Sequence, residues 1–258
     1  MILSRRLQML ARMVTPGNRV ADVGCDHGFL SIYLVQNGIS PRALAMDVRM
    51  GPLAAARAHI DECGLGAYID TRLSDGLKEC RPGEADTVVI AGMGGPLMEK
   101  ILTESMERAA QLKELILQPQ SELGRFRRFL KKSGFVIIDE GAVYEEEKYY
   151  FAMKAVFREC VTKECDPGGE ALQKAENDRA LGEFCKEEFG PLLLARRDPV
   201  LWQFLCFRKG VLEALSERLS AEPSERTKER LREVLGELHN IQWAQEYYRE
   251  AGQQGKSE

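Results

Sequence analysis

Residues 1–158 alternate between two hydrophobic periodicities, and this alternation leaves few folds open to the chain. Short apolar runs of strand length are separated by longer segments whose apolar residues recur at helical spacing. Such an order predicts an α/β fold built on a sheet. The predicted strands are Val20–Val23, Ala43–Asp47, Ala67–Arg72, Thr87–Ala91, Leu115–Gln118, Phe135–Ile138 and Tyr150–Val156. The predicted helices are Ser4–Val14, Phe29–Gln36, Gly51–Cys63, Pro96–Leu102 and Leu123–Lys132.

The last two predicted strands have no obvious helix between them. Their connection runs from Asp139 to Lys148 and is rich in Glu and Gly. Parallel neighbours need a long crossover, so a link without a helix predicts an antiparallel pair that closes an otherwise parallel sheet.

After Cys160 the chain changes character. The segment Asp166-Pro167-Gly168-Gly169 breaks regular structure, and the rest of the chain has helical periodicity. Leu205–Leu219 and Arg226–Tyr248 each carry one apolar stripe and are joined by a short polar turn, which predicts an antiparallel helical hairpin close to a coiled coil. We therefore expect a first domain over residues 1–158, a helical domain over residues 159–250 and a disordered tail over residues 251–258.

Composition narrows the class of protein. Hydrophobic residues make up 44% of the 258, enough for a substantial core, and no apolar stretch is long enough for a bilayer. We expect a soluble, cytoplasmic protein, with no stable protein partner implied. The seven cysteines form no Cys-x-x-Cys pair and the three histidines have no metal-ligand spacing with them, so we expect reduced thiols and no metal. The net charge of −4 confines any polyanion site to a local patch.

The most informative motif is the turn Asp22-Val23-Gly24-Cys25-Asp26-His27-Gly28, between a predicted strand and a predicted helix. Its glycines let the backbone approach a ligand at the switch point of the sheet. A dinucleotide-binding turn would instead read Gly-x-Gly-x-x-Gly and hold a pyrophosphate, which carboxylates repel. Asp22 and Asp26 suit a cationic ligand that carries an ammonium and a sulfonium. The alternative is an ordinary turn with an Asp helix cap.

Further acidic or glycine-rich positions come after the next three strands. Asp47 ends the second strand, where a carboxylate can accept both ribose hydroxyls. Asp75-Gly76 comes after the third, where it could take an adenine amino group. The fourth strand ends in Ile90-Ala91-Gly92-Met93-Gly94-Gly95-Pro96, a nearly side-chain-free loop that would contact a reacting group through its backbone. The alternative for this loop is a flexible turn before a helix that begins at Pro96.

These motifs in combination resemble the bacterial tRNA (adenine-22-N1)-methyltransferase family. The matching segments are Leu3-Ser4-x-Arg6-Leu7, the Asp22–Gly28 turn, Gly51-Pro52-Leu53, Ser74–Leu77, Ala91–Gly95, Leu115–Pro119, Phe189–Leu193 and Asp198-Pro199. The resemblance implies a Rossmann-like, seven-stranded methyltransferase sheet with a C-terminal helical coiled-coil domain, S-adenosylmethionine as cofactor and tRNA as substrate. Asp47 departs from the pattern, in which Glu is the commoner acid, but keeps the carboxylate.

On this basis we expect two groups of site residues. The cofactor-binding set is Asp22, Gly24, Cys25, Asp26, His27, Gly28, Asp47, Val48, Asp75, Gly76, Gly92 and Met93. The set beside the reacting atoms is Asp26, Gly92, Met93 and Gly94. Adenine N1 has an in-plane lone pair, so transfer to it needs alignment rather than a strong base. The base must first leave any stack. The product is cationic, and Asp26 could stabilise that charge, although capping of the next helix explains Asp26 as well.

For tRNA contact the densest basic segment is Gly124–Lys132, on a predicted helix whose cations would face outward. The predicted phosphate contacts are Arg5, Arg6, Arg125, Arg127, Arg128, Lys131, Arg196 and Arg197. A solvated helical face explains the segment equally well, and Arg6 could instead lie close to the cofactor. Two other functions remain open from the sequence, namely a methyltransferase for a protein or small molecule and a non-catalytic RNA-binding scaffold.

Overall fold

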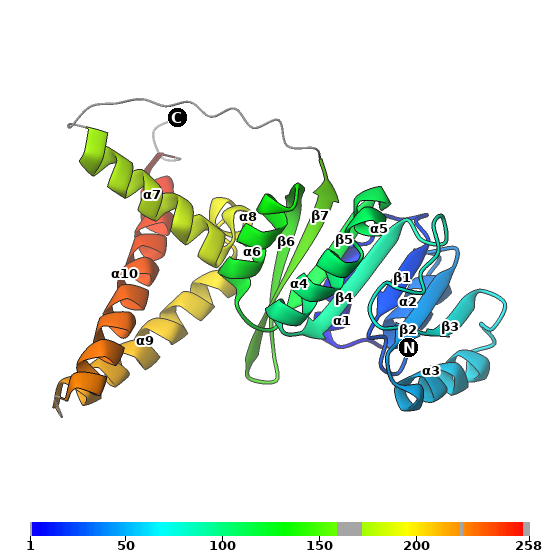
Figure 1. Ribbon diagram of the computed structural model, residues 1–258. Coiled ribbons are helices and arrows are strands. Elements are labelled where there is room, and N and C mark those ends of the chain that lie inside the picture. The colour runs from blue at the N-terminus through cyan, green and yellow to red at the C-terminus, as the bar shows by residue number, and fades with distance from the viewer. Residues whose placement is uncertain (1, 159–171, 222–223, 255–258) are drawn as a thin grey trace. The chain divides into compact units, whose positions relative to one another are not determined.

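The computed structural model describes residues 2–158, 172–221 and 224–254. It separates into two compact units, Met1–Val161 and Thr162–Glu258, and each is described by itself (Figure 1). None of the helices in the described ranges is both long and apolar enough to cross a membrane.

The described part of the first unit is built on a seven-stranded sheet with the order β3-β2-β1-β4-β5-β7-β6. Its strands are β1 (Val20–Val23), β2 (Ala43–Asp47), β3 (Ile69–Leu73), β4 (Thr87–Met93), β5 (Glu114–Pro119), β6 (Phe135–Glu145) and β7 (Lys148–Phe157). Neighbours from β3 to β5 are parallel, and β7 is antiparallel to both β5 and β6. The predicted Rossmann-like sheet closed by an antiparallel strand is confirmed.

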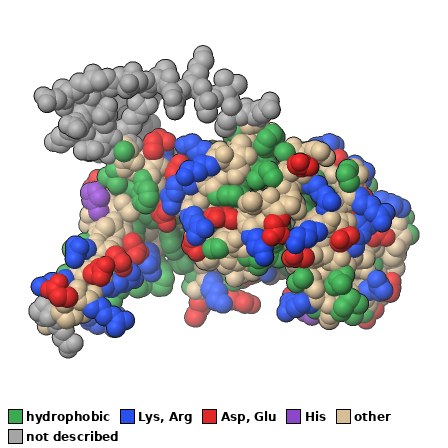
Figure 2. Space-filling model, viewed as in Figure 1, with side chains coloured by type: hydrophobic (Ala, Val, Ile, Leu, Met, Phe, Trp, Pro, Cys, Tyr) green, Lys and Arg blue, Asp and Glu red, His purple; other side chains and the backbone are tan. Residues whose placement is uncertain are grey.

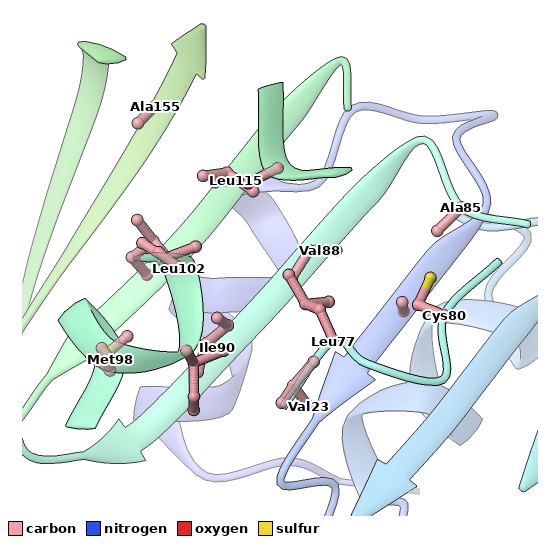
Figure 3. Packing of buried hydrophobic residues seen from close by; sticks show 14 of the residues in the cluster. Val23, Leu77, Cys80, Ala85, Val88, Ile90, Met98, Leu102, Leu115 and Ala155 are labelled. Atoms are coloured by element: carbon pink, nitrogen blue, oxygen red, sulfur yellow. The ribbon is translucent and has the colours of Figure 1, made fainter. Parts of the chain in front are cut away.

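Helices cover both faces of this sheet. They are α1 (Arg5–Met13), α2 (Phe29–Gln36), α3 (Met50–Glu62), α4 (Gly95–Glu104), α5 (Met106–Gln111) and α6 (Leu123–Lys132). Alternate strand residues feed the two layers. Val88 and Ile90 of β4 join the core under α4 and α6, whereas Val89 between them joins the core under α1 and α2. Figure 3 shows Ile90 beside Met98 and Leu102 of α4.

The strand order places a ligand site. After β3 the chain returns to the other side of β1, so β1 and β4 are neighbours whose following helices lie on opposite faces. In open parallel sheets, ligands bind in the crevice outside the carboxyl ends of the strands at such a switch point. The loops after β1, β2, β3 and β4 all end at that edge.

The terminal hairpin is longer than the sequence predicted. The segment 139–148 is not a loop, because β6 and β7 stay paired as far as Glu145 and Lys148. The turn between them is Glu146-Glu147, and both residues have positive φ, 49° and 60°. Two-residue hairpin turns of this kind usually contain Asn or Gly, so a pair of glutamates hid the signal. The short helix α5 was also not predicted.

The described part of the second unit is helical, with α7 (Leu172–Phe189), α8 (Pro191–Ala195), α9 (Pro199–Ala221) and α10 (Glu225–Gln254). The apolar stripes of α9 and α10 are buried at Leu205, Leu212, Val234 and Ile241, and the two helices pack as a hairpin. Coiled-coil supercoiling stays a prediction.

Both helices of this hairpin are longer than predicted. The helix α9 begins at Pro199, because Asp198 Oδ1 accepts the backbone N–H groups of Val200 and Leu201. At the other end, α10 continues to Gln254, so residues 251–254 are helical where a disordered tail was expected. The predicted break at 166–169 and the segment 255–258 lie outside the described residues.

Candidate functional site

A cleft of about 420 Å³ opens at the carboxyl ends of β1 to β5. It is lined by residues at the ends of these strands and in the loops after them, by two residues of α4 and by one residue of α1. The lining residues are Arg6, Val23, Gly24, Asp26, Asp47, Val48, Arg49, Ser74, Asp75, Gly76, Ala91, Gly92, Met93, Leu97, Ile101 and Gln120. Eight of the predicted cofactor-binding residues are among them.

The turn after β1 depends on glycine for two different reasons. Gly24 has φ of 75°, and a Cβ at this position would collide with Cε of Met93. Gly28 has φ of 73° and begins α2 against α3, where a Cβ would lie 3.1 Å from Cβ of Ala56. The N–H groups of Gly24 and Cys25 both donate to the Met46 carbonyl, which ties the turn to β2. Glycine at these positions therefore lets the turn pack closely against its neighbours in β2, β4 and α3, and it leaves the cleft above the turn open.

Four residues of this turn lie outside the lining of the cleft. Asp22 is buried and accepts a hydrogen bond of 2.9 Å from Oγ of Ser31, and burial raises its pKa to about 6. Cys25 is buried as well, and burial raises the pKa of its thiol. Gly28 begins α2, and His27 stacks on Phe29 with ring centroids 5.4 Å apart. These residues support the turn, and their predicted contact with the ligand stays a prediction.

Asp26 faces the cleft in an unusual backbone conformation. Its φ is 50°, in the left-handed region that costs free energy for a residue with a Cβ. Its side chain is 70% exposed and lies 3.7 Å from Nε2 of His27. The cap position of α2 is Gly28, with no side-chain cap hydrogen bond, so Asp26 does not cap this helix. The capping explanation is therefore wrong, and the strain falls on a residue of the candidate site.

The next two strand ends present the other carboxylates. Asp47 is buried, with Oδ1 accepting the backbone N–H of Arg49 at 2.9 Å. Asp75 is exposed, and its hydrogen bond with Lys78 lowers its pKa. Gly76 beside it has φ of 63°, and a Cβ there would lie 2.8 Å from Cγ2 of Ile101. The cleft thus has an acidic side over β1, β2 and β3.

The other side of the cleft is uncharged except for one cation. Gly92 has φ of 79°, and the N–H of Gln120 donates to the Met93 carbonyl at 2.8 Å. A Cβ on Gly92 would lie 3.1 Å from Nη1 of Arg6 and 3.8 Å from Nε2 of Gln120. The guanidinium of Arg6 and the carboxamide of Gln120, which both carry N–H donors, therefore lie beside the backbone of Gly92.

Arg6 is held in place from three sides. Its backbone N–H donates to Oε2 of Glu145 at 3.1 Å, and Nη1 donates to Oε1 of Gln118 at 3.2 Å. The guanidinium also lies 5.5 Å from the centre of the Tyr150 ring. Of the two positions that the sequence left open for Arg6, the structure has the one in the cleft.

The basic helix α6 is not uniformly exposed. Lys and Arg side chains gather over α6 in Figure 2, and acidic ones lie among the basic ones along this face. Arg127, however, is buried and pairs with the buried Glu140 at 2.8 Å, so its predicted outward orientation is wrong. It sits on the inner face beside Phe126. Arg125 is exposed but pairs with Glu99 and Glu122.

The remaining predicted phosphate contacts are spread over both units. Arg5 and Lys131 are exposed in the first unit, and Arg128 is half-buried there. Arg196 and Arg197 follow α8 in the second unit, with Nε of Arg196 3.7 Å from Asp198. Among the described residues, no group of three His, Cys, Asp or Glu side chains could hold a metal ion.

Comparison with known proteins places the chain in a family. A model of the methyltransferase domain matches residues 3–153. The tRNA (adenine(22)-N(1))-methyltransferase of Bacillus subtilis is 37% identical over 153 residues, which cover 59% of this chain and 64% of that protein. The crystal structure of the B. subtilis M1A22 tRNA methyltransferase matches with a TM-score of 0.76 at 28% identity, over 94% of this chain and 98% of that one. The chain belongs to the methyltransferase family that this domain model describes.

Solved structures with this fold include complexes with the cofactor. A Streptococcus pneumoniae protein in complex with S-adenosyl-L-methionine has a TM-score of 0.73 and 26% identity, over 94% of this chain and 99% of that one. In sequence, the aligned region spans slightly less than two thirds of the length of the B. subtilis relative.

Sequence reasoning missed several residues of the cleft in this family member. They are Val23, Arg49, Ser74, Ala91, Leu97, Ile101 and Gln120. Most of them end a predicted strand or come two residues after one, so proximity to the carboxyl edge of the sheet was a usable signal. Gln120 comes one residue after the motif Leu115–Pro119, and Ile101 needed the packing of α4 to be known.

Proposed function

We propose that this chain is an S-adenosylmethionine-dependent tRNA methyltransferase that methylates N1 of adenine 22. The observation that carries the proposal is the composition of one cleft. Carboxylates from the ends of β1, β2 and β3 line one side, and the nearly side-chain-free loop Gly92–Gly94 at the end of β4 lies on the other. Relatives that are named as methyltransferases for N1 of adenine 22 in tRNA support the assignment, as does a relative crystallised with S-adenosyl-L-methionine.

The residues of the acidic side fit such a cofactor. When bound, S-adenosylmethionine supplies a methyl group activated by a sulfonium. Asp47 would accept hydrogen bonds from the ribose hydroxyls and Asp75 one from the adenine amino group. Gly24 and Gly76 let the side chains of Met93 and Ile101 pack against the backbone in the lining of the cleft, where a Cβ would collide with them. The carboxylates also favour a cationic ligand over a pyrophosphate.

The other side would hold the acceptor base. Adenine N1 forms a bond to the methyl carbon as the carbon–sulfur bond breaks, and no proton has to leave N1 first. The chain therefore contributes mainly alignment, with Gly92, Met93 and Gly94 bounding the space for the base. The positive charge that develops on the purine is stabilised by a nearby carboxylate, and we assign this role to Asp26.

The tRNA must bring adenine 22 out of its stack to reach the cleft. Exposed cations on both units, among them Arg5, Lys131 and Arg196, would contact phosphates. Such contacts release counterions, so tRNA affinity should fall steeply as salt concentration rises.

The test is methylation of an unmodified tRNA transcript by the purified full-length chain with isotope-labelled S-adenosylmethionine. We expect label in 1-methyladenosine after digestion to nucleosides and mass spectrometry, and a reverse-transcription stop at position 22. A transcript with uridine at position 22 is the matched control and should take up no label.

Two results would count against the proposal. Label in another nucleoside would show a tRNA methyltransferase of different specificity. No label in any tRNA, with S-adenosylmethionine bound in calorimetry, would favour a protein or small-molecule acceptor or a non-catalytic role.

A further inference from the structure

The two glutamines at the end of β5 differ in what their carboxamides contact. Gln118 is buried, its Oε1 accepts from Arg6, and its Nε2 donates to the Pro119 carbonyl at 3.4 Å. Gln120 is exposed and lines the cleft. Within the part of the chain that the structure describes, no hydrogen bond is made by the Gln120 carboxamide, so both its donor and its acceptor are available to a ligand.

Gln120 is also fixed close to the loop where the acceptor base would lie. Its backbone N–H donates to the Met93 carbonyl at 2.8 Å. Its Nε2 is 3.8 Å from the position that a Cβ on Gly92 would take, so the carboxamide borders the space left by this glycine. The side chain therefore lies on the acceptor side of the cleft, away from Asp47 and Asp75 in the strand order.

The chemistry of the acceptor decides which edge a protein group can read. N1 must face the methyl group, so hydrogen bonds to N1 are excluded during transfer. The Hoogsteen edge of adenine, formed by the N6 amino group and N7, stays open. One acceptor and one donor at carboxamide spacing match this edge, and Asn or Gln pairs with it in two hydrogen bonds in protein–DNA complexes.

We infer that Gln120 determines specificity for adenine by pairing with the N6 and N7 edge of the acceptor base, an inference that rests on the proposed function. Oε1 accepts from N6–H, and Nε2 donates to N7. Arg6, the other polar group beside Gly92, has only donors, and an Arg fork matches guanine O6 and N7 instead. Its guanidinium is fixed by contacts with Gln118 and Tyr150, so we assign recognition of the adenine edge to Gln120 and not to Arg6.

The experiment combines a protein change with an atomic change in the tRNA. Wild-type chain and Gln120→Ala are each assayed on tRNA with adenosine or 7-deazaadenosine at position 22, which replaces N7 by a C–H group. We expect each single change to lower kcat/KM by roughly tenfold, the lower part of the range for a two-bond base contact. The two changes together should lower kcat/KM little more than either change alone.

Controls separate this contact from other effects. The 7-deaza change alters the reactivity of N1 equally in both proteins, so it cancels in the comparison. Gln111→Ala, at the exposed end of α5 and outside the cleft, should leave the 7-deaza effect unchanged. Fully multiplicative effects of Gln120→Ala and 7-deazaadenosine, or wild-type activity in Gln120→Ala, would overturn the inference and leave the proposed function intact. No 1-methyladenosine from the wild-type chain on unmodified tRNA would overturn both.

Discussion

The Cε methyl group of Met93 occupies the position that a Cβ on Gly24 would need. Gly24 belongs to the turn after β1 and Met93 to the end of β4, so the two neighbouring loops meet inside the cleft. The contact joins the predicted cofactor turn to the predicted acceptor loop. Any side chain on Gly24 must therefore displace a residue that borders the reaction space.

Gly24→Ala should weaken cofactor binding by more than its effect on folding explains. The φ of 75° is strained for alanine, and the added methyl group pushes Met93 into the cleft. We expect S-adenosylmethionine affinity to fall by about tenfold, equivalent to about 1.4 kcal/mol, in isothermal titration calorimetry. Gly38→Ala is the control, because Gly38 has φ of 66° with no atom of another residue within 4 Å of its Cβ position. Both variants should lose about 1 kcal/mol of folding stability. Equal affinities of Gly24→Ala and Gly38→Ala for S-adenosylmethionine would contradict the prediction.

Asp26→Gly should separate backbone strain from chemistry. Glycine accepts the φ of 50° at Asp26 without a steric penalty, so the free energy of unfolding should stay the same or rise by about 1 kcal/mol. The carboxylate is lost, and kcat for methyl transfer should fall on the order of tenfold, less than for a buried oxyanion-hole donor because Asp26 is exposed. Glu147→Gly, at φ of 60° in the β6–β7 turn, should match the stability effect with full activity. Full activity of Asp26→Gly would remove Asp26 from the mechanism.

The carboxyl edge of the sheet was predictable from the sequence because strand and helix periodicities differ and strand ends are marked by Asp and Gly. Asp47, Asp75 and Gly92 were found in this way. Gln120 was missed. Arg6 was left between two positions, since it reaches the cleft only through the packing of α1 against β6 and β7. Long-range contacts of this kind leave no local pattern.

The sequence also did not indicate which single charged side chains are buried. In the run Arg125-Phe126-Arg127-Arg128 every cation could have faced water, but Arg127 lies on the inner side of α6 and meets Glu140 of β6. The pairing depends on the position of the glutamate in the sheet, which the sequence of α6 does not contain. The backbone angles of Asp26 and of Glu146-Glu147 were likewise set by their surroundings rather than by residue preference.

Arg127→Met should destabilise the first unit by about 3–5 kcal/mol, because it breaks a buried ion pair by removing the Arg127 guanidinium from the buried carboxylate of Glu140. The double variant Arg127→Met with Glu140→Leu should recover most of this loss, since an apolar pair of similar volume avoids the desolvation cost. Urea unfolding followed by circular dichroism measures both. A single variant that loses less than about 1 kcal/mol would show that the pair is not buried as described.

Asp22→Asn should change the pH dependence of stability. Burial raises the pKa of Asp22 to about 6, whereas the same carboxyl in the unfolded chain has a pKa near 3.8. Between about pH 4 and pH 6 the native state therefore keeps a proton that the unfolded state has released, and stability falls as pH rises through this window. Above pH 6 the loss is complete and amounts to about 3 kcal/mol. Asparagine keeps an oxygen that can accept the Ser31 hydrogen bond and carries no charge.

The free energy gained by Asp22→Asn should accordingly be larger at pH 8 than at pH 4, by up to about 3 kcal/mol. Urea unfolding of the ligand-free protein at the two pH values measures the difference. Ser31→Ala is the companion variant. Without the Ser31 hydroxyl, which lowers the pKa of Asp22, the carboxyl should titrate higher and the pH-dependent loss should grow. A gain for Asp22→Asn that is the same at both pH values would show that the carboxyl of Asp22 is ionised with an ordinary pKa in the folded protein.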